Sequence, residues 1–415
     1  MQSSYKRLGD YIQLVDERNK DLKVKNLIGL TINKIFIPSV ANIIGTDMTN
    51  YKIIRKNQFA CSTMQVRRDK KMPLALYKSD EPAIISQAYP IFEIIDAKEL
   101  LPEYLMMWFT RAEFDREACF HAVGGVRGSL EWDDFLDFKL PIPSLEKQQE
   151  MVNEYHTIQN RINLNNQLIA KLEETAQTIY KQWFVDFEFP FDFAQGKPSE
   201  NGKPYKSNGG KMVWCEELEK EIPEGWELKR LEDEVTIIRG ASPRPIDEFM
   251  SKDNTGKPWV KISDATACPT RYLFETNEYI SQLGVSKSRE VKTGTLILSN
   301  SASPGLPRLM MIDACVHDGW LIFKDYKNIT KEILVEFLIF NKKDIVSSSN
   351  GSVFNNLKTE ILKEYRIFVP EKNMINRLSS LFQKLNNQLL IRGKKHQKLE
   401  ELKDLLLTKM TRVEN

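Results

Sequence analysis

An internal repeat constrains the fold of this chain more than any other feature of its sequence. The letters KLEE occur at Lys171 to Glu174 and again at Lys398 to Glu401, a separation of 227 residues. The same separation pairs Gly124 with Gly351, Leu130 with Leu357, Leu140 with Ile367, Pro143 with Pro370 and Ile179 with Leu406. Slightly different separations, as loop insertions would produce, pair Lys6-Arg7-Leu8 with Lys229-Arg230-Leu231 and Glu103-Tyr104-Leu105 with Glu336-Phe337-Leu338. Matches that stay in order along nearly the whole chain indicate a duplication.

Each copy consists of two parts with different sequence patterns. The first part, about Ser4 to Pro143 and again Glu224 to Pro370, has short apolar runs such as FACST, YPIFEI and TLILS between turn residues. These runs predict strands of a mixed α+β domain, with helices near 102–119 and 331–343. The second part of each copy is a long helix. We therefore expect a first domain at 1–145, a helical region at 146–189, a linker at 190–223, a second domain at 224–371 and a second helical region at 372–415.

Apolar residues on both long helices recur at alternating steps of three and four, which is the pattern of a coiled-coil seam. The seam includes Ile158, Ile162, Asn165, Ile169 and Leu172 in the first helix, and Leu385, Leu389, Arg392 and Leu399 in the second. Asn165 and Arg392 are equivalent in the repeat, and a polar residue in a seam costs stability but specifies register. We expect the helices to pair antiparallel as a spacer of roughly 60 Å, at about 1.5 Å per residue. The alternative is two amphipathic helices, each packed on its own domain.

The composition is that of a globular protein. Apolar residues make up 41% and charged residues 28% of the chain, which excludes a disordered or collagen-like class. No stretch approaches the roughly 20 apolar residues of a membrane span, and the polar start MQSSYKRLGD lacks a signal-peptide core, so we expect a cytoplasmic protein without membrane contact. The five cysteines are isolated from one another, which favours reduced, buried thiols over disulfides or a zinc site.

The stretch between the copies, PFDFAQGKPSENGKPYKSNGGKMVW, is rich in Gly, Pro, Ser, Asn and Lys and predicts an exposed linker. It overlaps a dense aromatic run, WFVDFEFPFDF. This run has two equally weighted interpretations. It is either a helix end fixed onto a neighbouring domain or a docking surface for a partner.

Motifs of catalysis are missing from the sequence. It contains no G-x-x-x-x-G-K-[ST] phosphate loop, no G-x-G-x-x-G turn, and no N-P-P-Y or D-P-P-Y segment of the kind that amino-methyltransferases use. The four histidines are scattered, and His317 beside Cys315 is more typical of a structural residue than of a metal ligand. Glu227 in ELK resembles part of a nuclease site but has no aspartate partner upstream. Duplicated domains on a spacer, without catalytic motifs, indicate a protein that reads its ligand.

Basic residues cluster in the first copy, although the net charge of +2 argues neither for nor against nucleic acid. The stretch from Arg55 to Lys78 contains seven Lys and Arg residues and only one acidic residue, Asp69. Such a cluster is suited to phosphate groups. A solvated loop explains it equally well.

Several stretches resemble the DNA-specificity subunit of Type I restriction–modification systems. They are PWVKISDATA, ETNEYISQLGV and KTGTLILSNSASPG in the second copy, LPIPSLEKQQEMV before the first helix, and KQWFVDFEFP, GKPYKSNGGKMVW and KEIPEGWELKRLEDEV around the linker. The similarity spans essentially the whole chain. It implies two target-recognition domains, each reading one half of a bipartite site in double-stranded DNA. It also implies a pseudo-twofold arrangement, in which the helix pair sets the number of unread base pairs between the half-sites.

The resemblance assigns the chemistry to partner subunits. Two modification subunits would bring S-adenosylmethionine and N6-adenine methylation, which needs base flipping. Restriction subunits would bring translocation and cleavage driven by ATP with Mg. This chain would then be a non-catalytic subunit without a cofactor or metal of its own. Two rivals stay open: a reader that serves a methyltransferase–nuclease fusion, and a structural coiled-coil adaptor whose basic loops are incidental.

Candidate DNA contacts lie in loops of both domains, because Lys and Arg suit phosphates, whereas Arg, Asn, Gln and Ser can read base edges. In the first domain they are Arg55, Lys56, Arg67, Arg68, Lys70 and Lys71, together with Arg127 in GGVRGSL. A glycine turn with a solvated arginine is the alternative for Arg127. In the second domain they are Arg239, Arg244, Lys261, Lys287, Arg289, Ser301 and Arg308, together with Asn350 and Asn355 in the equivalent loop SSSNGSVFNN.

Overall fold

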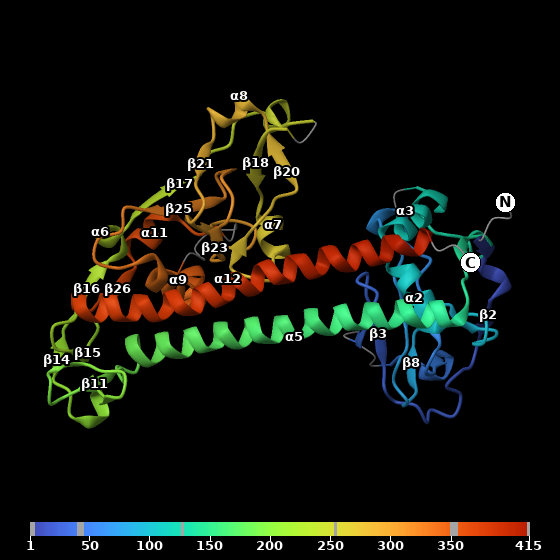
Figure 1. Cartoon of the computed structure of the whole chain (residues 1–415), viewed down its shortest axis with the longest axis horizontal. Helices are drawn as coiled ribbons and strands as arrows, with labels where there is room; N and C mark the ends of the chain where they lie inside the picture. Colours follow the sequence, from blue (N-terminus) through green and yellow to red (C-terminus); the bar gives the residue numbers. More distant parts are fainter. Residues whose placement is uncertain (1–4, 40–44, 126–127, 253–254, 349–355, 413–415) are drawn as a thin grey trace. The chain divides into compact units, whose positions relative to one another are not determined.

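Two long helices dominate the fold, α5 (Leu145–Phe184) and α12 (Lys372–Lys409), as Figure 1 shows. The computed structural model describes residues 5–39, 45–125, 128–252, 255–348 and 356–412. The chain forms two compact units, residues 1–163 with 398–415 and residues 164–397. Each unit combines short strands, short helices and one part of each long helix, so the mixed α+β class predicted from the sequence is confirmed.

The first unit is built on a small antiparallel sheet of order β2-β9-β6-β7, with the separate strand pairs β1–β10, β3–β4 and β5–β8. Its strands are β1 (Tyr5–Arg7), β2 (Ile12–Val15), β3 (Ile28–Leu30), β4 (Phe36–Pro38), β5 (Lys52–Ile54), β6 (Phe59–Cys61), β7 (Leu74–Leu76), β8 (Ala83–Ile85), β9 (Ile91–Ile94) and β10 (Lys139–Pro141). Its short helices are α1 (Val66–Asp69), α2 (Pro102–Thr110), α3 (Ala112–His121) and α4 (Trp132–Leu136).

Aromatic side chains hold the core of this unit. Phe59 of β6 stacks on Phe92 of β9 with ring centroids 5.0 Å apart, and Phe109 packs edge-on against both rings. One helix was predicted over 102–119, but the structure has two. Arg111 takes an extended conformation between them, with its guanidinium 4.1 Å from the centroid of the Trp108 ring, and a residue with extended backbone ends a helix.

The second unit contains two sheets, of orders β17-β25-β22-β23-β19 and β20-β18-β24-β21, and smaller strand groups β16–β26, β14–β15 and β12-β11-β13. Its strands are β11 (Pro190–Asp192), β12 (Lys197–Pro198), β13 (Lys203–Pro204), β14 (Met212–Cys215), β15 (Lys220–Pro223), β16 (Glu227–Arg230), β17 (Thr236–Arg239), β18 (Lys257–Val260), β19 (Tyr272–Leu273), β20 (Glu278–Ile280), β21 (Arg289–Val291), β22 (Leu296–Ser299), β23 (Pro307–Met310), β24 (Ala314–Val316), β25 (Trp320–Lys324) and β26 (Arg366–Val369). Its short helices are α6 (Leu231–Glu234), α7 (Ile262–Ala267), α8 (Gln282–Val285), α9 (Lys331–Phe340), α10 (Lys342–Ser347) and α11 (Thr359–Glu364).

The two units share one topology, which supports the duplication read from the sequence. The order β2-β9-β6-β7 recurs as β17-β25-β22-β23, and all of these neighbours are antiparallel in both units. Even single hydrogen bonds recur. The Leu8 amide donates to the Phe138 carbonyl at 2.7 Å, and the Leu231 amide donates to the Tyr365 carbonyl at 2.8 Å.

The long helices pair along an apolar seam within each unit. In the first unit, Ile158 and Ile162 of α5 cluster with Leu399 and Leu406 of α12. In the second, Ile169 and Leu389 share one core, and Leu172 and Leu385 pack against it. The Asn165 amide donates to the Arg392 carbonyl at 2.9 Å. Contacts move backwards along α12 as they move forwards along α5, so the predicted antiparallel pair is confirmed.

Both long helices also pack on the bodies of the domains. The alternative interpretation, two amphipathic helices that each pack on a domain, was therefore partly right. Met151 and Val152 of α5, with Leu407 and Met410 of α12, belong to the aromatic core of the first unit. At Gly393, a Cβ atom would come within 3.0 Å of the Phe274 ring, so this glycine allows α12 a close approach to the second domain.

A buried ion pair inside the second domain lies where this domain contacts both helices. Arg271 lies before β19 and bonds to Glu336 of α9, and their side chains are 3% and 0% exposed. Gln177 of α5 donates to the same Glu336 carboxylate at 2.6 Å, and Tyr272 donates to the Asn386 carbonyl of α12 at 2.7 Å. Burial opposes the charge on Arg271, but Glu336 and Glu173 outweigh it and raise the pKa of the guanidinium.

The segment predicted as an exposed linker is folded, which corrects that expectation. Strands β11, β12 and β13 form one sheet and β14 and β15 a hairpin. The aromatic run fixes the end of α5, because Phe189 stacks on Tyr205 and Trp226 and all three are buried. Arg377 of α12 donates to the Pro198 carbonyl at 2.6 Å. Gly202 allows close packing here, because a Cβ atom would lie 2.5 Å from the Phe191 backbone, and Pro190, Pro198 and Pro204 lie in the strands.

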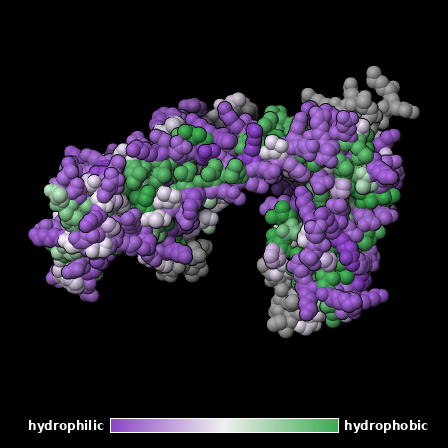
Figure 2. All heavy atoms as spheres, turned by 60° about the horizontal axis from the view of Figure 1, so that its bottom comes forward, coloured by the Kyte–Doolittle hydropathy of each residue, from purple (hydrophilic) through white to green (hydrophobic). Residues whose placement is uncertain are grey.

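Hydrophilic residues cover most of the face drawn in Figure 2, with apolar patches among them. In the part of the chain that the structure describes, no helix combines the length and the hydropathy of a membrane span. The five cysteines are free. Cys61 and Cys315 are buried as expected, whereas Cys119, Cys215 and Cys268 are only half-buried.

Asn165→Leu should stabilise the protein. The Asn165 Oδ1 atom is buried without a hydrogen-bond partner among the described residues, and an unsatisfied buried acceptor costs about 1–3 kcal/mol. The expected result is a higher urea midpoint than wild type, whereas Gln167→Leu on the exposed side of the same helix should leave the midpoint unchanged. A lower midpoint for Asn165→Leu would contradict this account of the seam.

Arg271→Met should destabilise the protein by about 3–5 kcal/mol, because it leaves the Glu336 carboxylate buried without its partner. The double variant Arg271→Met/Glu336→Leu should recover much of this loss. Lys292→Ala is the matched control, since it breaks an ion pair with Asp313 in the same unit that is exposed and therefore contributes little to stability. Urea unfolding tests all three variants, and equal losses for Arg271→Met and the control would refute the claim.

Candidate nucleic-acid interface

Two loops meet in the first unit and form one edge of it. The loop after β6 carries α1, and the loop after α3 carries Gly124 to Leu130. The Leu130 amide donates to the Thr63 carbonyl at 2.9 Å, and the Arg67 guanidinium donates to the Gly124 carbonyl at 3.1 Å. Gly128 fits closely here, because a Cβ atom would lie 2.8 Å from the Arg67 Cβ. The basic cluster and the glycine-rich loop, far apart in the sequence, are thus brought together.

Basic side chains project from this edge. Arg67, Arg68, Lys70 and Lys71 are exposed. The Arg68 guanidinium chelates the neighbouring Asp69 carboxylate at 2.7 and 3.1 Å, which lowers the pKa of Asp69. Two non-glycine residues in the left-handed region, Gln65 (φ 64°) and Lys70 (φ 51°), flank α1. This conformation costs roughly 1 kcal/mol or more per residue and is common at functional sites.

The other candidates of the first domain are not part of this edge. Arg55 and Lys56 precede β6 and lie at the opposite end of that strand from α1. Arg55 forms a two-bond ion pair with Glu17, and Lys56 pairs with Asp80 at 2.6 Å. Arg127 lies outside the described residues.

The second unit repeats the loop contact. The Leu357 amide donates to the Asn300 carbonyl at 2.8 Å, as the equivalent Leu130 amide does to Thr63. Gly305 packs on α10, since a Cβ atom would lie 2.9 Å from Val346. Ser301 is half-buried in this loop, and Asn350 and Asn355 lie outside the described residues. A groove of about 440 Å³ follows the contact, and Arg239, Asn300, Asn356, Lys358, Glu360 and Lys363 are among the residues that line it.

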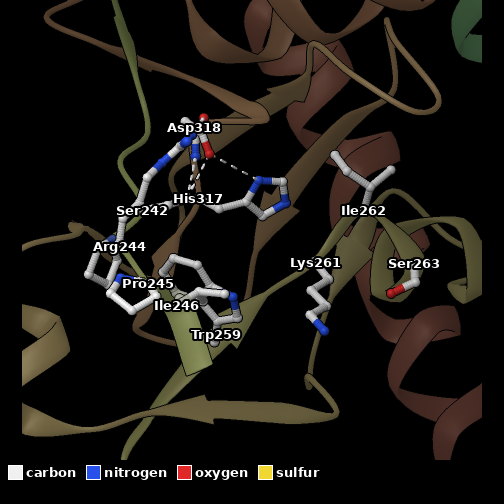
Figure 3. A pocket seen from close by; sticks show the side chains of 11 residues that line it. Ser242, Arg244, Pro245, Ile246, Trp259, Lys261, Ile262, Ser263, His317 and Asp318 are labelled. Carbon is white, nitrogen blue, oxygen red and sulfur yellow. Dashed lines mark hydrogen bonds and ion pairs between the residues drawn. The ribbon is translucent and has the colours of Figure 1, made fainter. Parts of the chain in front are cut away.

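A polar turn at Asp318 gathers further candidates of the second domain. The Asp318 carbonyl accepts hydrogen bonds from Arg239 at 2.7 Å and from Asn300 at 3.3 Å. Its carboxylate accepts one from Ser242, which lowers the pKa of that carboxyl, and lies 3.6 Å from Arg244. On the other side of this turn lies a cavity of about 920 Å³, shown in Figure 3, to which Lys261 also contributes. Lys261 itself pairs with Glu278.

The three remaining candidates of the second domain have different surroundings. Lys287 lies 4.5 Å above the Phe249 ring, and Arg289 begins β21 and is exposed. Arg308 is only 9% exposed, and its guanidinium donates to the carbonyls of Ala265, Pro307 and Cys268. It therefore stabilises the domain from inside, so we withdraw it as a candidate DNA contact.

Sequence reasoning missed several residues of the interface. Lys358 and Asn300 line the groove, but they stand alone in the sequence, outside any basic cluster. Trp259 and His317 line the cavity, and the only sequence signal for them was the pair Cys315 and His317, which was interpreted as structural. Among the described residues, no group of three or more His, Cys, Asp or Glu side chains is placed to hold a metal ion.

Known proteins with similar sequences are specificity subunits. The chain is 24% identical over 326 residues to the Type I restriction enzyme MjaIX specificity subunit of Methanocaldococcus jannaschii, covering 76% of this chain and 70% of that protein. It is 23% identical over 385 residues to the HindI specificity subunit of Haemophilus influenzae, covering 79% and 80%. The crystal structure of a Type I restriction–modification S subunit from M. genitalium has the same fold, with a TM-score of 0.52 and 15% identity over 99% of this chain and 96% of the other.

A family profile gives the assignment. The profile described as "Type I restriction modification DNA specificity domain" matches residues 31–174 and 223–401, so it occurs twice and covers most of the chain. The two matches follow the duplication seen in the fold. The chain belongs to this family and is a Type I specificity subunit, a non-catalytic subunit that recognises DNA sequence for a restriction–modification complex.

Proposed function

We propose that each domain reads one half of a bipartite DNA site through its loop pair. The reading loops would be α1 with residues 124–125 and 128–130 in the first domain, and residues 300–305 with residues 356–358 before α11 in the second. The observation that carries this proposal is the recurring contact, Leu130 to Thr63 and Leu357 to Asn300, at the same place in the shared topology. A scaffold that is repeated and presents different side chains at one edge suits two different half-sites.

The two edges offer different chemistry to DNA. Arg67, Arg68, Lys70 and Lys71 suit phosphates and guanine edges, because arginine can bond both acceptors of guanine in the major groove. The second edge offers Asn356 and Ser301, a composition suited to adenine and to water-mediated contacts, with Arg239 and Lys358 for phosphates. Two unequal half-sites follow from this difference.

The antiparallel helices would set the distance between the half-sites. A stiff pair of helices fixes a number of base pairs between two readers, and dimeric DNA readers fix half-site spacing in the same way. Asn165 bonded to Arg392 supports this role, because a polar pair in a seam specifies one register. A pseudo-twofold arrangement of the domains would present equivalent faces to the two strands.

The partners would supply catalysis in the cytoplasm. Two modification subunits would bind the duplicated chain at equivalent places and methylate one adenine in each half-site at N6, using S-adenosylmethionine. Restriction subunits would add cleavage driven by ATP and Mg. This chain would need no cofactor itself, because its part is to bind and position the DNA.

Methylation mapping tests the proposed function. The subunit is expressed with its modification partner in a host without DNA methylation, and N6-methyladenine is mapped across the genome. We expect one split motif with a methylated adenine in each half. A continuous motif, or methylation that stays the same when the specificity subunit is omitted, would contradict the proposal.

Arg68→Ala should weaken recognition of the first half-site by about 1–3 kcal/mol, because a base or phosphate contact is lost. Arg55→Ala is a closely matched control: the two side chains are 48% and 52% exposed and each chelates one carboxylate, but Arg55 lies at the other end of β6. Binding of the complex to the mapped site measures both. Loss at one base pair would mark Arg68 as a base reader, and a uniform loss a phosphate contact. Equal behaviour of the two variants would contradict the assignment of this edge.

A further inference from the structure

The cavity beside the Asp318 turn is a feature of the second domain that DNA reading by the loops leaves unexplained. Its volume is about 920 Å³. The segment Ser242–Ile246, the end of β18 with the start of α7, and the turn at His317 and Asp318 form its walls (Figure 3).

The walls of the cavity are mainly apolar. Pro245 is exposed and Ile246 half-buried, while Ile262 and Trp259 are buried beneath them. Trp259 is fixed in a small core with Ile280 and Cys315, against which Ile246 packs. Rigid apolar walls of proline, isoleucine and an indole favour a ligand with flat hydrophobic faces, such as a heterocyclic ring.

One hydrogen-bond donor in these walls is free for a ligand. The Nδ1 atom of His317 accepts the Gly319 amide at 2.9 Å, so the neutral ring carries its proton on Nε2. Burial lowers the pKa of His317, which keeps the ring neutral at pH 7. No partner for Nε2 occurs among the residues that the structure describes. The ring lies in the cavity wall between Asp318 and Ile262 (Figure 3), where Nε2–H can donate to a ring nitrogen or carbonyl.

Two cations stand at the rim of the cavity. The Arg244 side chain is 82% exposed, with Asp318 as a distant ion partner at 3.6 Å, and Lys261, which pairs with Glu278, lies on another side of the cavity (Figure 3). Cations on two sides of an apolar slot suit a flat ring that carries an anionic group on each side. A nucleotide within a DNA strand has this chemistry, a base between two phosphates.

The cavity and the reading groove share the Asp318 turn. The Asp318 carbonyl binds Arg239 and Asn300, which line the groove, while its carboxylate and His317 line the cavity. The groove and the cavity are therefore neighbours on two sides of one turn.

We propose that this cavity receives one base swung out of the duplex at the half-site that the second domain reads. The inference rests on the proposed function and deepens it. Unstacking a base costs a few kcal/mol, and apolar stacking, the His317 donor and the two rim cations would offset that cost. The base is distinct from the two adenines that the modification subunits would take out of the stack.

The test uses the complex with its modification subunits and the mapped target. A series of duplexes covers the half-site. In each duplex all bases of the half-site are kept, and the base opposite one of them is removed. For a base that leaves the duplex, removing its partner abolishes the cost of unpairing, so binding should tighten about tenfold or more. We expect this gain at one position besides the methylated adenines.

Ile246→Trp fills the cavity and should abolish the gain at that position. Ser263→Trp, from an exposed position on the rim, is a second filling variant in case the first does not fold. Leu283→Trp on exposed α8 is the control and should keep the gain. No gain at any further position, or a gain that survives both filling variants, would overturn the proposal. Loss of the modification subunits from the purified filling variants would also overturn it, because the cavity would then be a protein-docking site. Failure of the proposed function is distinguishable, since no split methylation motif would be found at all.

Discussion

The apolar seam between α5 and α12 is the constraint on which the rest of the structure depends. A helix of this length with one apolar stripe is stable only when the stripe is covered. Within each unit the partner helix covers part of the stripe and the domain body covers the remainder, as Ile169 and Leu389 in the core of the second unit illustrate. Each recognition domain is therefore built onto the helix pair, and in the second domain the buried Arg271 also reaches Glu173 of α5 at 3.4 Å, which adds a charged contact to the apolar ones.

This construction is compatible with the two specificities proposed above. Both domains repeat the order of the main sheet and the pairing of the last strand with the first, β10 with β1 and β26 with β16. They also repeat the loop contact that follows β6 in the first domain and β22 in the second. The side chains on the loops differ: arginine on α1 with lysine directly after it, and serine and asparagine around Asn300. Loops tolerate such change because their residues contribute little to the core. The second domain also has the sheet β20-β18-β24-β21, and β18 and the turn after β24 supply walls of the cavity.

The features that could be predicted from the sequence are those that leave a periodic signal. The repeat, the helix seam and the mixed α+β class have such a signal. The two-helix break at Arg111 was missed, since one extended residue does not disturb the apolar period. The linker was misjudged because Gly202 and Pro198 are typical of loops, although here Gly202 packs closely on the Phe191 backbone and Pro198 belongs to strand β12.

Among single residues, charge alone did not separate roles. Arg55, Arg68 and Arg308 are alike in sequence, but one pairs with Glu17 at the far end of β6, one stands at the loop edge, and one is buried on backbone carbonyls. Only tertiary contacts distinguish these three roles. The cavity was equally invisible, because its walls come from three segments between residues 242 and 318.

Site-specific photo-crosslinking tests the central claim, that the two loop edges read opposite halves of one site. A photoreactive amino acid is placed at Arg68, at Asn356 or, as a control, at Lys56, and the assembled complex is irradiated on its target DNA. The account predicts crosslinks from Arg68 to one half-site and from Asn356 to the other, with none from Lys56. Crosslinks from Arg68 and Asn356 to the same half-site, or to a modification subunit in place of DNA, would contradict it.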